Sequence, residues 1–373
     1  MGSKRLMLQN GLGDLLRSEC VGATRFVDLF AGSGAVSCFV ATHMAMPVQA
    51  SDIQKYSVIL TRSVISRDRP LDAEHFWERW FAAALKVRQT IRIRKTRKGT
   101  RADVEELRVW SDSRDGWPIT KAYGGHYFSP LQAIWIDSLR QTIPKAEPFH
   151  SVALAALISA SSRCAAAPGH TAQPFQPTRR GKKYLKHAWS NDIPAHAKKA
   201  LTVIAPQHAI QKGIARVAEA NVAASKLKAN DLVFIDPPYS GVQYSRFYHV
   251  LESIAMGKTG PVCGIGRYPA RSLRPRSNFS MKTLSLAAMQ ELLEIIAHRK
   301  AKAIVTFPEH YCSNGLSGKL IREAAEQHFE VRTMSIASRF STLGGTGRPA
   351  KAGKCREARQ PAMELVLTLT PRS

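Results

Sequence analysis

One early segment restricts the possible folds of this 373-residue chain more than any other feature. The apolar run at residues 25–30 ends in the turn 31–34, which has the sequence Ala-Gly-Ser-Gly. An apolar stretch with helical character follows at 35–46, and a second strand is expected at 47–52. Strand, glycine turn, helix and strand in this order predict a parallel sheet flanked by helices, which is the α/β class.

The glycine turn is suited to a ligand. Gly32 and Gly34 let the backbone turn tightly and leave no Cβ between it and a bound molecule. A dinucleotide fingerprint would need a third glycine where Ser37 stands, and the Gly-Lys-Ser/Thr of a phosphate loop is absent here. Asp52, at the end of the second strand, can accept hydrogen bonds from both hydroxyls of a ribose. These residues indicate a nucleoside-containing cofactor; the alternative is an ordinary strand–turn–helix connection.

A second motif, Asp236-Pro237-Pro238-Tyr239, directly follows an expected buried strand at 232–235. An adenine amino nitrogen is a poor nucleophile, because its lone pair is delocalised into the ring. The Asp236 carboxylate and the Pro237 carbonyl could accept its two hydrogens, while two prolines fix the backbone. Tyr239 offers a face on which a flipped base can stack. The motif therefore predicts chemistry on an exocyclic amino group; the alternative is a rigid turn.

The two motifs, FVDLFAGSG at 26–34 and FIDPPY at 234–239, resemble those of the Dam-like class of N6-adenine-specific DNA methyltransferases. The resemblance implies S-adenosylmethionine as the cofactor and methyl transfer to the N6 amino group of adenine in DNA. It also implies a Rossmann-like methyltransferase fold with a mainly parallel sheet and a basic inserted region. Softer matches lie at residues 2–5, at 244–252, and at 343–345 with 364–367.

The resemblance assigns roles to individual residues. Asn221 stands where many relatives carry an acidic residue near the cofactor adenine. No metal is expected, because the histidines and cysteines form no ligand grouping. The expected catalytic residues are Asp236, Pro237, Pro238 and Tyr239, and the expected cofactor-binding residues are Lys4, Asp28, Phe30, Gly32, Gly34, Asp52 and Asn221.

The charge balance indicates a polyanionic partner. Lys and Arg number 54 against 28 acidic residues, giving a net charge of +26. Such an excess favours nucleic acid, and we expect double-stranded DNA as the partner. No long apolar span suggests a membrane. Six scattered cysteines without a CxxC pair, and an N-terminus without the apolar core of a signal peptide, predict a cytoplasmic protein.

The chain divides, by pattern, into a first part of the methyltransferase core at 1–70, an insertion at 71–213 and a second part at 214–373. The insertion contains two dense basic runs, which we interpret as the DNA-recognition region; a solvated charged face is the alternative. The candidate nucleic-acid-binding residues are Arg92, Arg94, Lys95, Arg97, Lys98, Arg179, Arg180, Lys182 and Lys183.

Two other functions fit the same residues. The first is methylation of adenine in structured RNA by the same chemistry. The second is a catalytically inactive DNA-binding module, which the intact motif at 236–239 disfavours. The sequence leaves open which DNA sequence is recognised, the oligomeric state, and whether the role is restriction-modification, phage defence or gene control.

Overall fold

The computed structural model describes residues 4–93, 100–341 and 359–372, leaving aside the side chains at 339–341 and 359–362. The chain divides into two compact units. We call the first the core unit, which comprises Met1–Ile53, Ala209–Tyr244 and Arg276–Ser373. The second, the helical unit, comprises Gln54–His208 and Ser245–Pro275. The division predicted from the sequence places residues 54–70 and 245–275 with the core and 209–213 with the insertion, whereas the first two segments lie in the helical unit and the third in the core unit.

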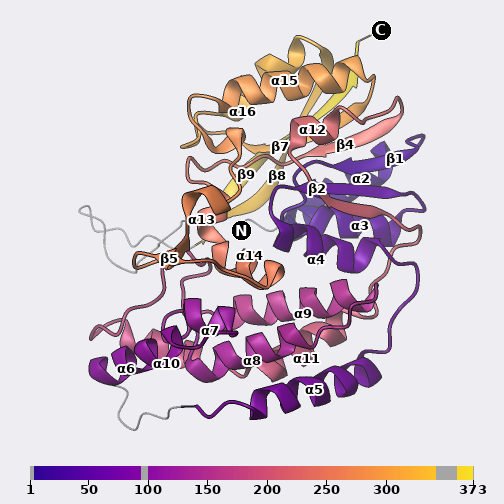
Figure 1. Cartoon of the computed structure of the whole chain (residues 1–373). Coiled ribbons are helices and arrows are strands. Elements are labelled where there is room, and N and C mark those ends of the chain that lie inside the picture. Colours follow the sequence, from indigo (N-terminus) through magenta and orange to yellow (C-terminus); the bar gives the residue numbers. More distant parts are fainter. Residues whose placement is uncertain (1–3, 94–99, 342–358, 373) are drawn as a thin grey trace. The chain divides into compact units, whose positions relative to one another are not determined.

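The core unit is built on a seven-stranded sheet with the order β3-β2-β1-β4-β7-β9-β8 (Figure 1). Its strands are parallel except β9, which runs antiparallel to both of its neighbours. The α/β class with a mostly parallel sheet is therefore confirmed. The strands are β1 (Arg25–Asp28), β2 (Val48–Asp52), β3 (Ile214–Val217), β4 (Asp231–Ile235), β7 (Lys302–Pro308), β8 (Phe329–Ser341) and β9 (Arg359–Pro371).

The sheet has a switch point between β1 and β4. From β1 the chain adds β2 and then β3 toward one edge, whereas β4 starts on the other side and leads to β7. Connections that leave β1 and β4 therefore diverge, and ligands bind at such points, beyond the carboxyl ends of the strands. Asp28, the last residue of β1, pairs in register with Phe234 of β4. The segment that follows β4 thus begins beside the end of β1.

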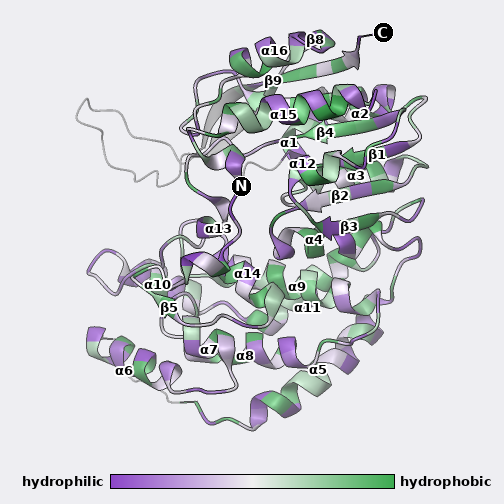
Figure 2. Ribbon diagram, turned by 45° about the horizontal axis from the view of Figure 1, so that its top comes forward, coloured by the Kyte–Doolittle hydropathy of each residue, from purple (hydrophilic) through white to green (hydrophobic). Residues whose placement is uncertain are grey.

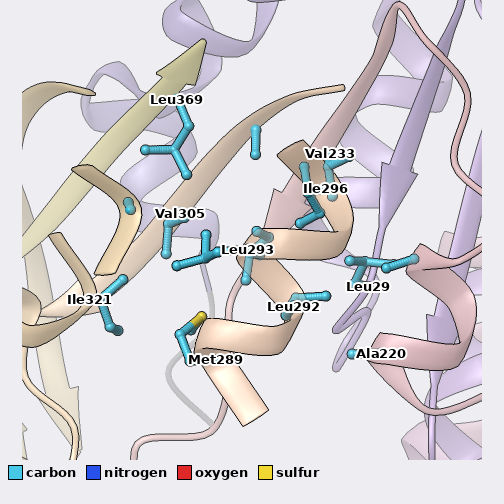
Figure 3. Close-up of a cluster of buried hydrophobic side chains, with 14 of the residues drawn as sticks. Leu29, Ala220, Val233, Met289, Leu292, Leu293, Ile296, Val305, Ile321 and Leu369 are labelled. Carbon is cyan, nitrogen blue, oxygen red and sulfur yellow. The ribbon is translucent and has the colours of Figure 1, made fainter. Parts of the chain in front are cut away.

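Apolar helices cover one face of this sheet. Leu292, Leu293 and Ile296 of α15 are fully buried, in one cluster with Val233 and Val305 of the strands (Figure 3). Burying one such side chain stabilises the fold by about 1.5–3 kcal/mol. The helices of the core unit are α1 (Arg5–Met7), a π-helix (Leu8–Leu12), α2 (Gly13–Glu19), α3 (Ala35–His43), α12 (Ala220–Ala224), α15 (Ser285–His298) and α16 (Gly318–Glu326).

The helical unit has α9 (Phe149–Cys164) at its centre, packed against α4, α8, α11 and α14. Figure 2 shows that α9 is largely hydrophobic, whereas α6 carries both hydrophobic and hydrophilic residues. α8 begins at Pro130 because Ser129 and Gln132 cap its first turn reciprocally. The other elements are α4 (Lys55–Ile65), α5 (Ala73–Gln89), α6 (Arg101–Asp112), α7 (Pro118–Tyr123), α8 (Pro130–Gln141), α10 (Lys182–Trp189), α11 (Ile193–Ile204), α14 (His249–Met256), and the short hairpin β5 (Val262–Cys263) and β6 (Tyr268–Pro269), with α13 (Tyr244–Phe247) at the junction.

Across the described ranges of the chain, no helix has both the length and the apolar character required of a membrane span.

Candidate active site

The carboxylate of Asp28 is buried at the end of β1. One oxygen accepts a hydrogen bond from the Ser37 hydroxyl at 2.6 Å, and the other accepts from the backbone N–H of Phe30 at 3.1 Å. Ser37 lies in the first turns of α3, so a helix and a loop both fix this side chain. Asp28 therefore has a defined orientation at the switch point of the sheet.

The glycine turn connects β1 to α3 with left-handed backbone at two positions. Gly32 has a φ of +51° and Gly34, the N-cap of α3, has a φ of +76°. Residues other than glycine rarely adopt such φ values. Asp52, at the end of β2, accepts a hydrogen bond from the Gly32 N–H at 2.9 Å. The turn and the second-strand carboxylate, separate in sequence, thus form one surface.

Burial raises the pKa of Asp28 to about 7; hydrogen bonds from Ser37 and Phe30 lower it, whereas the charges of Asp236 and Asp52 raise it. The folded pKa exceeds the unfolded one, so the free energy of unfolding falls as pH rises between about 4 and 7. We expect Asp28→Asn to be more stable relative to wild type at pH 8 than at pH 5, by about 2–3 kcal/mol, because about two pH units of the shifted range lie above pH 5. Urea unfolding at both pH values measures this. An equal difference at the two values would show that Asp28 is already ionised at pH 5.

The Asp-Pro-Pro-Tyr segment follows β4 and is held by a hydrogen bond from a buried side chain. The Pro238 carbonyl accepts a hydrogen bond of 2.7 Å from the side chain of Asn314, which is fully buried. Within the described part of the chain, no group donates to the Pro237 carbonyl. Tyr239 is half-buried against the apolar cluster, and its ring lies edge-on to Tyr244 at 6.5 Å. The segment therefore offers a carbonyl acceptor at Pro237 and an aromatic ring two residues later.

Asp236 belongs to a three-residue charged network. Lys4 Nζ lies 3.0 Å from Asp236 Oδ1 and also contacts Glu364 Oε2. The Thr306 hydroxyl donates to the same Oδ1 at 3.1 Å, whereas no group in the described part of the chain donates to Oδ2. Burial raises the pKa of Asp236, and Glu364 raises it further, although the Lys4 ammonium lowers it. Burial alone would lower the pKa of Lys4, but the two carboxylates raise it, so Lys4 is cationic.

Sequence reasoning missed Glu364, Thr306 and Asn314. Glu364 lies on β9 beside Pro308 of β7, and the antiparallel course of β9 brings it to the edge where β1 and β4 end. One signal was present, because Glu364 is the single carboxylate of β9 and directly precedes the apolar run 365–367. Such a residue is seldom buried without a partner.

The other two predicted cofactor residues lie apart from that network. The Phe30 ring packs edge-on against Phe279 at 5.0 Å. The amide nitrogen of Asn221 donates to Glu291 at 2.7 Å and to the Ala288 carbonyl, both on α15, while its Oδ1 is buried without a partner. Phe30 thus stays beside the glycine turn, whereas Asn221 is held toward α15.

The basic residues predicted for nucleic acid lie in the helical unit. Arg92 is exposed, while Arg94, Lys95, Arg97 and Lys98 lie outside the described residues. Arg179, Arg180 and Lys183 are exposed, and Lys182 is half-buried at the start of α10. Across the described ranges, none of these side chains forms an ion pair with a carboxylate. In the same ranges, no three His, Cys, Asp or Glu side chains gather as metal ligands.

The fold and the site define a class. A parallel α/β sheet with a glycine turn and carboxylates at its switch point is typical of nucleotide-binding enzymes. Within that class, the chain belongs to the D12 class N6 adenine-specific DNA methyltransferase family, whose sequence model matches residues 1–92 and 173–265, about half of the chain. The family resemblance predicted from the two motifs is confirmed.

One similar protein of known name is the modification methylase StsI of Streptococcus sanguinis. It is 35% identical over 79 residues, which are 21% of this chain and 12% of the relative. The matched part is thus a small fraction of that protein.

Proposed function

We propose that this chain transfers the methyl group of S-adenosylmethionine to the N6 amino group of adenine in double-stranded DNA. The observation that carries the proposal is the arrangement at the end of β4. Among the described residues, no group donates to Oδ2 of Asp236 or to the carbonyl of Pro237, and the half-buried Tyr239 follows two residues later. The charge of Asp236 raises the pKa of Asp28 at the end of β1, so the two carboxylates lie near each other. Two acceptors match the two hydrogens of an amino group, and the ring matches a flipped base.

The core unit suits the proposed cofactor. We place it at the switch point of a Rossmann-like methyltransferase fold, where the order β3-β2-β1-β4 is that of doubly wound nucleotide-binding sheets. Asp28 and the turn at Gly32 and Gly34 would hold its methionine end, with Phe30 alongside, and Asp52 its ribose. When bound, S-adenosylmethionine supplies an electrophilic methyl group. The Asn221 amide is already hydrogen-bonded to α15, so we assign this residue a contact only through its Oδ1.

The protein's own residues would act on the adenine by positioning. Asp236 and Pro237 accept the amino hydrogens and direct the nitrogen lone pair out of the ring plane. Lys4 and Thr306 hold the other oxygen of Asp236, so the carboxylate cannot rotate. Tyr239 holds the base by stacking and keeps water out. The nitrogen gains the methyl group and loses one proton, and Asp236 is the nearest base for it.

Asp52→Ala should weaken the binding of S-adenosylmethionine by about 1.5–3 kcal/mol, the range for a hydrogen bond to a charged group. Isothermal titration calorimetry measures the dissociation constant. Glu330→Ala removes an exposed carboxylate from β8 and is the matched control, with no expected change. An unchanged dissociation constant for Asp52→Ala would show that a residue other than Asp52 contacts the ribose.

We assign DNA contacts to the basic runs of the helical unit, Arg92, Arg94, Lys95, Arg97 and Lys98, and Arg179, Arg180, Lys182 and Lys183. Their charge, within a net charge of +26, supports binding to phosphates. Because the relative is named a modification methylase, we also propose a role in restriction-modification.

Transfer of labelled methyl groups to matched duplex DNA and structured RNA tests this function. We expect label in DNA alone. Label in RNA alone would favour the RNA enzyme, and cofactor binding without transfer to either would favour an inactive binding module.

A further inference from the structure

The helical unit contains a cavity of about 210 Å³ that the proposed chemistry does not use. Its lining comes from α14 and from residues 258–275, the segment that contains the β5–β6 hairpin. Pockets for whole drug-sized molecules measure roughly 300–1,000 Å³, so this cavity suits one part of a larger ligand. Its charged and apolar lining residues include Glu252, Met256, Lys258, Leu273, Arg274 and Pro275.

Two cations give the cavity a positive side. Lys258 and Arg274 both line it, and across the described ranges neither forms an ion pair. Nε of Arg274 is buried and has no hydrogen-bond partner. A buried polar atom without a partner is unfavourable, so an acceptor from a ligand would satisfy it. The charges of Lys258 and Arg274 are therefore available to bind an anion.

An aromatic support holds the guanidinium in place. Arg274 lies over the Tyr268 ring at 5.4 Å, and Arg246 lies over the same ring at 5.0 Å. The Tyr268 hydroxyl is fixed by the carbonyl of Ala172, and its ring packs on His249 at 4.8 Å. Arg274 is therefore preorganised, which lowers the ordering entropy that binding has to overcome.

The neighbouring ionisable groups do not cancel this charge. Glu252 directs both of its oxygens to the start of α4, accepting from Lys55 N–H at 2.9 Å and Tyr56 N–H at 3.0 Å. The positive end of that helix compensates its charge. Burial lowers the pKa of His249 to about 4, so this residue is neutral at physiological pH.

We propose that this cavity binds one nucleotide of the DNA substrate, with its phosphate on Lys258 and Arg274 and its sugar or base on the apolar wall. The inference rests on the proposed function and adds a DNA contact outside the basic runs. The apolar side chains Met256, Leu273 and Pro275 lie beside the cations, as a phosphate joined to an apolar group requires. Arg267, in contrast, is occupied by Asp112 at 2.6 Å and by two carbonyls, so it has a structural role.

The test measures the binding of full-length protein to a labelled duplex by fluorescence anisotropy between 50 and 200 mM salt. Each lost phosphate contact reduces the slope of log affinity against log salt by about one. Both side chains are proposed to hold the same phosphate, so for the double variant Lys258→Gln/Arg274→Gln we expect a slope smaller by about one, and at least about tenfold weaker binding at low salt. The double variant Arg299→Gln/Lys302→Gln removes the same charge from exposed positions of the core unit and should behave as wild type. Thermal unfolding checks that both variants fold.

Deoxycytidine monophosphate, which lacks the target base, is titrated in parallel. A reduced slope in the cavity variant alone supports the proposal. A slope equal to the control, with wild-type protein still methylating the duplex, overturns it and leaves the proposed function intact. Loss of mononucleotide binding with an unchanged DNA slope also overturns it, because the occupant is then a free nucleotide. Wild-type protein that neither binds nor methylates any duplex overturns the proposed function itself.

Discussion

Replacing Asp236 with Ala should slow methyl transfer at least about 100-fold, comparable to the loss of one preorganised transition-state contact in other enzymes. The variant loses Oδ2, which we assign to the amino group, and Oδ1, which contacts Lys4 and Thr306. Binding of DNA and S-adenosylmethionine should change only a few-fold, because neither depends mainly on this carboxylate. Single-turnover methylation with saturating cofactor measures the rate constant of the step.

Thr306→Val is the graded control for this experiment. It removes one neutral hydrogen bond to Oδ1 but leaves Oδ2 in place, so a loss of about tenfold or less is expected. Near wild-type transfer by Asp236→Ala would contradict the catalytic assignment. A loss in Thr306→Val equal to that in Asp236→Ala would show that the site fails through general disorder.

Replacing Lys4 with Met should lower the free energy of unfolding by about 3–5 kcal/mol, the range found when one partner of a buried ion pair is removed. Lys4 is only 7% exposed and pairs with both carboxylates. Without its charge, the negative charges of Asp236 and Glu364 repel each other at the same edge of the sheet. The deficit should shrink as pH falls toward 5, because burial raises the pKa of Asp236 and its protonation removes the repulsion. Urea unfolding at pH 5 and pH 8 measures both effects.

The double variant Lys4→Met/Glu364→Gln separates repulsion from lost packing. Glu364→Gln removes one of the two unpaired charges, so the double variant should be more stable than Lys4→Met alone at pH 8. If Glu364→Gln lowers the free energy of unfolding further instead, repulsion between Asp236 and Glu364 does not explain the deficit. Lys4 then stabilises the fold mainly through its own contacts.

The sequence predicted the strands well where their pattern is local. The run of strand, turn, helix and strand at 26–52 became β1, α3 and β2, and the buried strand at 231–235 became β4. For the end of the chain, the apolar pattern indicates a strand pair at 330–336 and 363–369, whereas β8 and β9 each have 13 residues. Hydrogen bonds between the two antiparallel strands extend them beyond their apolar part, and residues beyond position 336, such as the exposed Ala337 and the polar Ser338, do not continue a hydropathy pattern.

The site was predictable only where one segment carries it. Asp28, the glycine turn and the 236–239 motif each lie in a single stretch, so local sequence indicated them. Glu364 and Thr306 reach Asp236 only because the sheet order sets β4, β7 and β9 side by side. The inclusion of 245–275 in the helical unit is likewise a tertiary contact, and no composition change marks its boundaries.

The identity of the methylated base decides whether the chain acts on the adenine amino group. Duplex DNA is incubated with the protein and S-adenosylmethionine and digested to nucleosides. The nucleosides are separated by liquid chromatography and identified by mass spectrometry. We predict N6-methyldeoxyadenosine as the product with wild-type protein, and its absence with Asp236→Ala. Methylated cytosine in place of methylated adenine, or equal N6-methyldeoxyadenosine from both proteins, would contradict the account.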